Sequence, residues 1–152
     1  MITDLQMKLG AEAAFYQAKK SYAEGGVPVG SALIINLCVV SLGHNQRYQG
    51  MSNIIHGETD CIEKAGHNCE FDKSIIFTTL SPCMMCAGAI TLFRIPTVVI
   101  LDTENAMDFP DSAPFLREAG VDVIVEPYQP AIDLMTKYRT ENMKRWLADV
   151  GK

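Results

Sequence analysis

The spacing of hydrophobic and polar residues in the first third of the chain predicts one helix followed by a β-hairpin. Apolar residues recur at helical intervals over residues 3–23. Residues 31–35 and 39–43 are apolar and β-branched, which predicts two strands joined by a turn at 36–37. The polar residues 44–53 then predict a loop.

The rest of the chain alternates between helical and strand patterns. Helices are predicted at 56–65, 81–93 and 130–147, with a short one ending at Gly120, and strands at 74–79, 97–101 and 121–125. The strand at 97–101 has no polar alternation, which indicates burial on both faces. Such an order predicts an α/β fold, a three-layer α/β/α sandwich with helices on both faces of one sheet. We find no repeat or linker, so residues 1–152 are expected to form a single domain.

Composition narrows the possible partners. No apolar run approaches the roughly 18 residues that span a bilayer, and the N-terminus lacks the pattern of a signal peptide, so we expect a soluble cytoplasmic protein without a membrane partner. The formal net charge is −5 and the basic residues are scattered. Proteins that bind nucleic acid usually carry a basic patch. The sequence therefore disfavours a polynucleotide substrate.

Five cysteines, an odd number without a secretory signal, do not indicate a disulfide framework. Cys38 lies in an apolar run and is expected in the core, as is Cys61. Cys69 is expected to be a surface or half-buried thiol. Only Cys83 and Cys86 have a spacing that indicates chemistry.

The motif Ser81-Pro82-Cys83-Met84-Met85-Cys86 predicts a thiolate pair at a helix start. Ser81 suits an N-cap and Pro82 the first helical position, which would place Cys83 and Cys86 on one face. The helix N-terminus lowers thiol pKa values, and two adjacent thiolates need a cation. Zinc accepts such ligands, although a pair of buried or redox-active thiols has the same spacing.

His56 is the best candidate for a third ligand, because it opens the preceding helix in His56-Gly57-Glu58. His44 and His67, the other two histidines, are expected at the surface. Three protein ligands with one open position are typical of a catalytic zinc that holds water. Residues two apart diverge in mid-helix, so His56 and Glu58 can share a site only at the helix start, with Glu58 reaching the water as a proton shuttle. The alternative for Glu58 is a solvated first-turn carboxylate.

The combination H-x-E and P-C-x-x-C is the signature of zinc nucleobase and nucleoside deaminases. On these motifs the chain is identified as a member of the cytidine deaminase-like zinc hydrolases, and it most closely resembles the fungal-type cytosine deaminases. The resemblance extends over nearly the whole chain, through stretches at 22–30, 43–47, 78–83 and 146–151. It implies a five-stranded mixed sheet, one catalytic Zn²⁺ per subunit and a homodimer.

The resemblance also implies roles for residues around a base. Asn45 would hydrogen-bond the ring edge, and the backbone N–H of Gly57 would meet the ring carbonyl. Asp149 would accept from the exocyclic amine, and Trp146 would close the pocket. Further substrate-binding positions implied in this way are Val29 and Ser81.

Two positions depart from the fungal-type pattern. Asp108 stands where those enzymes carry an aromatic pocket residue, with Phe109 one position later, and both are taken as candidate substrate contacts. Tyr48 replaces a phenylalanine-like residue. An acid in the pocket wall would favour an amidine-like base such as guanine or isocytosine.

The activity expected from the resemblance is hydrolytic deamination of a free nucleobase, foremost cytosine to uracil and ammonia, by zinc-bound hydroxide with Glu58 moving the protons. Alternatives are deamination of guanine, isocytosine or another amino-heterocycle, and a tRNA adenosine deaminase. A tRNA adenosine deaminase is disfavoured by the acidic net charge, by Gly57 and by the C-terminal segment with Trp146 and Asp149. A structural zinc or redox domain is the alternative outside catalysis.

Overall fold

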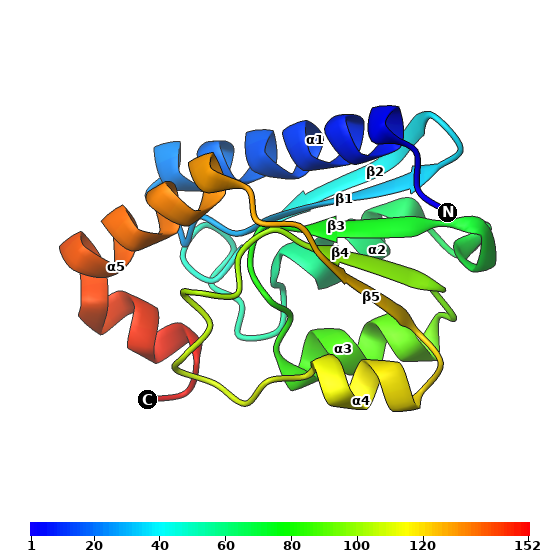
Figure 1. Cartoon of the computed structure of the whole chain (residues 1–152). Helices are drawn as coiled ribbons and strands as arrows, with labels where there is room; N and C mark the ends of the chain where they lie inside the picture. The colour runs from blue at the N-terminus through cyan, green and yellow to red at the C-terminus, as the bar shows by residue number, and fades with distance from the viewer.

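The computed structural model describes all 152 residues, and one five-stranded sheet lies at its centre (Figure 1). Along the sheet the strands follow the order β2-β1-β3-β4-β5. Strand β1 pairs antiparallel with β2 and β3, whereas β3, β4 and β5 are parallel. The strand bounds are β1 Gly30–Ile35, β2 Cys38–His44, β3 Ile75–Thr78, β4 Thr97–Ile100 and β5 Asp122–Val125. The predicted mixed sheet and α/β class are thereby confirmed.

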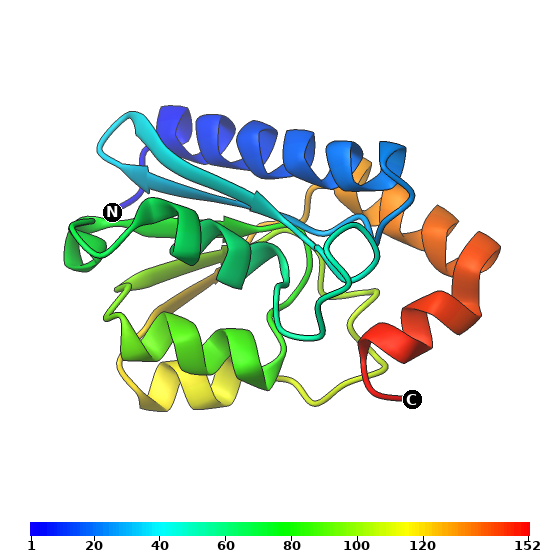
Figure 2. The ribbon, with the colours of Figure 1, turned by 180° about the vertical axis from the view of Figure 1, so that it is seen from behind.

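Helices cover both faces of this sheet (Figures 1 and 2). On one face lies α1, with α5 beside it and extending past the sheet, and on the other lie α2, α3 and α4. The parallel pairs need crossovers, which α3 and α4 supply. The helix bounds are α1 Asp4–Ala23, α2 Gly57–Ala65, α3 Met84–Leu92, α4 Ala113–Glu118 and α5 Gln129–Asp149, with a short 3₁₀ turn at Phe71–Lys73. None of these helices combines the length and apolarity needed to cross a bilayer.

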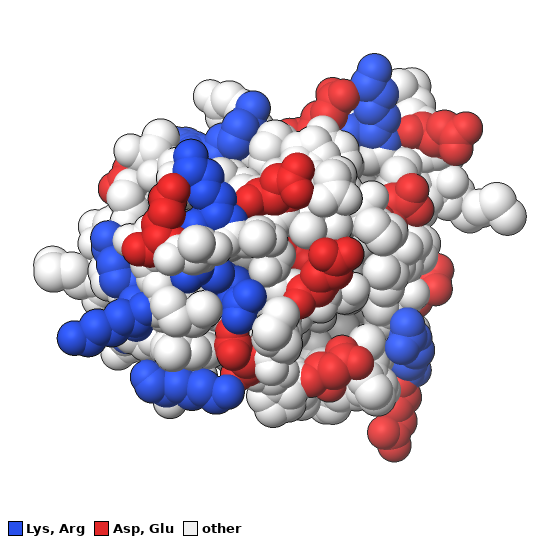
Figure 3. All heavy atoms as spheres, turned by 60° about the vertical axis from the view of Figure 1, so that its left-hand side comes forward, with Lys and Arg blue, Asp and Glu red and all other residues white.

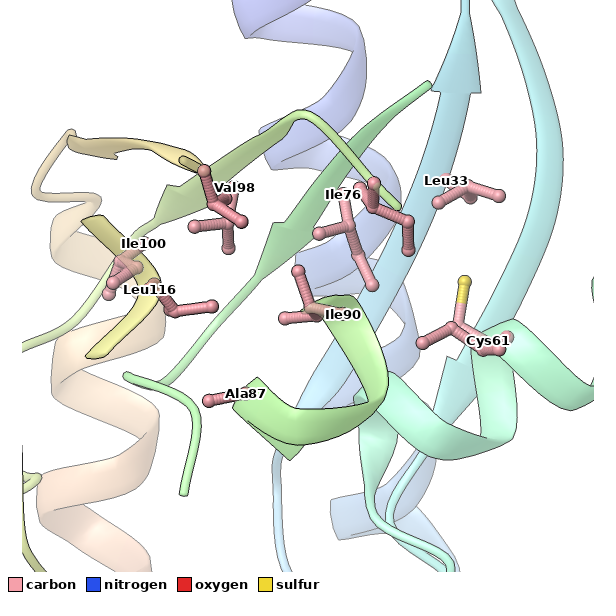
Figure 4. Close-up of a cluster of buried hydrophobic side chains, with 11 residues drawn as sticks. Leu33, Cys61, Ile76, Ala87, Ile90, Val98, Ile100 and Leu116 are labelled. Atoms are coloured by element: carbon pink, nitrogen blue, oxygen red, sulfur yellow. The ribbon is translucent and has the colours of Figure 1, made fainter. Parts of the chain in front are cut away.

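The core has one cluster on each face of the sheet, because successive strand residues point to opposite sides, and a third, smaller cluster around Trp146 of α5. In β4, Val98 and Ile100 pack toward α2, α3 and α4, whereas Val99 and Leu101 at its end pack toward α1. Figure 4 shows the first cluster, in which strand side chains meet Ile90 and other helix residues. Burial of β4 on both faces, predicted from its unbroken apolar run, is confirmed.

Two helices differ from their predicted starts and ends. Helix α3 begins at Met84 with Cys83 as its N-cap, so the prediction that Ser81 caps it was wrong. The backbone N–H of Ser81 donates to Asp102 O at 2.8 Å, which keeps this segment extended beyond β3. Helix α5 continues to Asp149 and is interrupted at Asn142, where φ is −137° and ψ is 38°.

Two burial predictions were also wrong. Cys38 is exposed, because it starts the edge strand β2, whose first three residues face solvent. His44 is buried, with Nε2 at 3.1 Å from Glu24 Oε1 and Nδ1 at 3.0 Å from Asn45 O. Cys61 is buried and Cys69 half-buried, as predicted.

Candidate active site

The N-termini of α2 and α3 bring three potential metal ligands together. His56 is the N-cap of α2, Cys83 is the N-cap of α3, and Cys86 lies in the first turn of α3. Nδ1 of His56 lies 3.5 Å from the Cys83 sulfur and 3.7 Å from the Cys86 sulfur. All three donor atoms lie within 4.8 Å of one another.

This donor set fits zinc. With Zn–S bonds of about 2.3 Å and Zn–N bonds of about 2.0–2.1 Å, nitrogen and sulfur ligands of a tetrahedral ion lie about 3.6 Å apart. The two N···S distances agree with that value. Three protein donors leave the fourth tetrahedral position to water or substrate, as in catalytic zinc sites.

Without a metal, Cys83 is the thiolate of the site, while His56 and Cys86 hold protons. The hydrogen bond from Cys86 lowers the pKa of Cys83 to about 4, with a further contribution from His56. The same hydrogen bond and burial raise the pKa of Cys86. Burial lowers the pKa of His56, but Cys83 and the nearby carboxylates outweigh it and raise that pKa to about 9. Metal binding must displace the protons of His56 and Cys86, so acid weakens it.

Glu58 lies beside these ligands in a buried position, not in solvent. The N-cap His56 has extended backbone angles, φ −89° and ψ 177°, so the divergence expected in mid-helix does not apply. The Glu58 carboxylate accepts hydrogen bonds from Thr78 Oγ1 at 3.1 Å and from Ser31 Oγ at 3.4 Å. Burial raises the pKa of Glu58, and the charge of Cys83 adds to this. A carboxyl group of raised pKa suits proton transfer near neutral pH.

The metal ligands and Glu58 border a small cavity of about 310 Å³, part of it open to solvent. Its lining residues are Val29, Asn45, His56, Glu58, Leu80, Ser81, Cys83, Phe109, Trp146, Asp149 and Val150. Six of them are substrate positions proposed from the sequence. Leu80 and Val150 were missed, although each adjoins a residue that the sequence indicated. The cavity therefore lies between the C-terminal end of α5 and the residues that flank β1 and β2, Val29 and Asn45.

Two polar residues of the cavity wall, Asn45 and Asp149, are hydrogen-bonded to each other. Asn45 Nδ2 donates to Asp149 Oδ2 at 3.1 Å, and Asn45 Oδ1 accepts from the backbone N–H of Arg47 at 2.9 Å. The other oxygen of Asp149, Oδ1, is buried without a hydrogen-bond partner and lies 3.8 Å from His56 Nε2. Burial raises the pKa of Asp149, while His56 opposes the shift. A buried acceptor without a partner is available to an N–H group of a ligand.

Two sequence candidates do not line the cavity. Gly57 is the first residue of α2, so its N–H has no acceptor within the helix. A Cβ at this glycine would lie 3.1 Å from Val29 O, which restricts the position to a very small residue. Asp108 is turned away from the cavity, and its Oδ2 accepts from Trp146 Nε1 at 2.7 Å and from Arg139 Nη2 at 2.9 Å. Phe109 takes the place in the wall.

Comparisons with known proteins agree with this site. Residues 6–102 match the family described as the cytidine and deoxycytidylate deaminase zinc-binding region. The chain is 42% identical to a cytosine deaminase of Candida albicans over 95% of its own length and 97% of that protein. It is 36% identical to a tRNA-specific adenosine deaminase of Bacillus subtilis, over 62% of this chain and 60% of that one.

Solved structures show the same fold at low sequence identity. A guanine deaminase from Nitrosomonas europaea superposes with a TM-score of 0.72 at 15% identity, over 92% of this chain and 86% of that one. A structure from work on tRNA:A34 deaminases has a TM-score of 0.69 at 20% identity, over 80% of this chain and 99% of that one. With its ligand motifs inside the matched region, the chain belongs to the cytidine and deoxycytidylate deaminase family of zinc-binding proteins.

Proposed function

We propose that this protein is a zinc-dependent hydrolase that converts free cytosine to uracil and ammonia, with one catalytic ion per subunit. The observation that carries the proposal is the buried Glu58 carboxylate, which borders the same small cavity as the three zinc donors. Similarity to the Candida cytosine deaminase over nearly the full chain supports cytosine as the substrate.

The residues around the cavity suit this chemistry. When bound, zinc supplies a water of lowered pKa and polarises the reacting centre. Glu58 would take a proton from that water and deliver it to the ring nitrogen, then take the proton of the newly added hydroxyl and deliver it to the leaving amine. Its hydrogen bonds to Thr78 and Ser31 hold the carboxylate in place for both transfers.

The remaining polar groups match the edge of cytosine. The unpartnered Oδ1 of Asp149 would accept from the exocyclic amine, and Asn45 would bind the ring edge. Gly57 does not line the cavity itself but stands between His56 and Glu58, which do, and its backbone N–H would donate to the ring carbonyl. Trp146 and Phe109 supply the apolar walls that a flat ring needs.

The cavity and the surface around it suit a single-ring base better than guanine or a tRNA. The free space enclosed by the cavity is small, which favours one ring over the two fused rings of a purine. Trp146, Asp149 and Val150 close one side of it and lie outside the region 6–102. On the side of the molecule where α5 lies, acidic side chains are interspersed among the basic ones (Figure 3). This face does not offer the continuous basic surface that a polynucleotide prefers.

The test is ammonia release by the zinc-loaded protein from cytosine, isocytosine, guanine and adenine, and from a tRNA anticodon stem-loop that contains adenosine. We expect the highest kcat/KM with cytosine and no ammonia release from the stem-loop. A higher kcat/KM for guanine than for cytosine would contradict cytosine as the substrate and indicate a purine deaminase. Release from none of these substrates, with zinc bound, would point to a structural metal.

We also propose that the active form is a homodimer. Large apolar side chains are exposed on α3, at its C-cap and on the loop before α2. The ribbons of α3 and of this loop lie on the same side of the molecule in Figure 2. These residues are Met51, Ile54, Met84, Leu92 and Phe93. Several exposed large apolar side chains on one side of a molecule are what a subunit interface would cover. Sedimentation should give twice the 16.7 kDa of one chain, and a single-chain mass at all protein concentrations would contradict the dimer.

A further inference from the structure

One oxygen of Asp108 accepts hydrogen bonds from two side chains of α5. These two residues lie on opposite sides of the point where the helix is interrupted. Oδ2 accepts from Arg139 Nη2 at 2.9 Å and from Trp146 Nε1 at 2.7 Å. Between these two residues Asn142 leaves the helical conformation. Asp108 therefore connects the first part of α5 to the C-terminal part that carries Trp146 and Asp149.

The loop that carries Asp108 is itself anchored to the end of β4. Asp102 is buried, and its Oδ1 accepts from the backbone N–H groups of Glu104 and Asn105 at 2.8 and 3.1 Å. The Asn105 amide donates to Asp102 Oδ2 at 2.7 Å and to Thr136 Oγ1 at 3.2 Å. This network gives Asp108 a fixed support on the sheet and on α5.

The side chain that Asp108 fixes forms part of the wall of the base cavity. Trp146 is 1% exposed and lines the cavity. The ring of Phe109 packs edge-on against it, with the centroids 6.3 Å apart and the planes at 64°. A hydrogen bond from the indole N–H to a carboxylate is charge-assisted and directional, so it selects one orientation of the indole ring.

We propose that Asp108 is a positioning residue, which sets the orientation of Trp146 and Phe109 in the cavity wall and does not contact the base. The inference rests on the proposed function in that this cavity receives the base. It differs from the expectation raised by the sequence, in which an acid at this position would select an amidine-like base. The two groups that donate to Asp108 Oδ2, Arg139 Nη2 and Trp146 Nε1, both belong to α5 and not to a ligand.

Trp146 is the only tryptophan of the chain, so its fluorescence reports on this network without background. In zinc-loaded Asp108→Ala the indole N–H loses its acceptor. We expect emission at longer wavelength, stronger quenching by acrylamide and a rise of about tenfold in KM for cytosine. Glu104→Ala is the matched control, because this exposed carboxylate lies in the same loop and its side chain makes no hydrogen bond or ion pair. It should leave all three quantities unchanged.

A double-mutant cycle separates positioning from base contact. In a Trp146→Phe background, where the indole N–H is absent, Asp108→Ala should add almost nothing to the rise in KM. Independent effects that multiply would overturn the proposal, as would a change of the preferred base from cytosine to guanine in Asp108→Asn. Asp108→Asn keeps an oxygen that can accept from the indole N–H, so the orientation of Trp146 should be retained in it.

The fluorescence measurement stands without any substrate, so it distinguishes a failure of this inference from a failure of the proposed function. Unchanged emission and quenching in Asp108→Ala would overturn the role of Asp108 even if cytosine is deaminated. Should Asp108→Ala not fold, Arg139→Gln removes the other donor to the same oxygen. We then expect increased quenching of Trp146, and unchanged quenching would contradict the inference.

Discussion

Glu58→Gln is expected to bind zinc as the unaltered protein does and to lose turnover of cytosine, with kcat falling by about 10²–10⁴-fold or more. The amide has the size of the carboxylate and still offers an oxygen to Thr78 and Ser31, so the cavity keeps its shape. It cannot accept the proton of the attacking water. Zinc content per chain and the rate of uracil formation, both measured on the same sample, test this.

Asp60→Asn is a suitable control for Glu58→Gln. Asp60 is also a buried carboxylate in the first turn of α2, but it accepts from the backbone N–H of His44 at 2.9 Å and from Lys64 Nζ at 2.8 Å, away from the cavity. The control should retain kcat within a few-fold, with some loss of stability. If Glu58→Gln kept more than about a tenth of the activity, Glu58 would not be the proton carrier.

Cys86→Ser is expected to lose both the metal and the activity. Cys86 is fully buried, and its sulfur is one of three donors. The hydroxyl of serine stays protonated and is a poor ligand for zinc, which prefers thiolate here. We expect zinc content to fall from about one ion per chain to near zero at micromolar zinc. The thermal transition should fall with it, because metal bound only by the folded state stabilises that state.

Cys38→Ser is the matched control, since this exposed cysteine starts β2, at the end of the strand opposite to His44 and the cavity residue Asn45. It should keep zinc, activity and thermal stability. Zinc retained at about one ion per chain in Cys86→Ser would mean that the metal uses another set of donors.

Local pattern and spacing were sufficient to predict the layers and to single out the three potential metal ligands that the fold brings together. Val98, Val99 and Ile100 are consecutive apolar residues, as expected of a strand covered on both faces. His56 and the two cysteines stand at helix starts, which parallel-sheet topology gathers at the same end of the fold. These properties depend on neighbours along the chain.

Burial that depends on distant contacts could not be predicted in this way. Cys38 has an apolar neighbourhood in sequence, but its strand lies at the sheet edge. His44 sits among polar residues, yet Glu24 at the end of α1 closes over it. Asp108 looked like a pocket acid, and its partners are 31 and 38 residues away on α5. No periodicity encodes such pairings.

The most direct test of the central claim is turnover of cytosine in water labelled with heavy oxygen, followed by mass spectrometry of the product. Hydrolytic deamination at this site predicts uracil that carries one labelled oxygen, with one ammonia released for each uracil. The zinc-loaded Glu58→Gln protein should form no such product. Uracil without the label, or labelled uracil formed equally by the Glu58→Gln protein, would contradict the account.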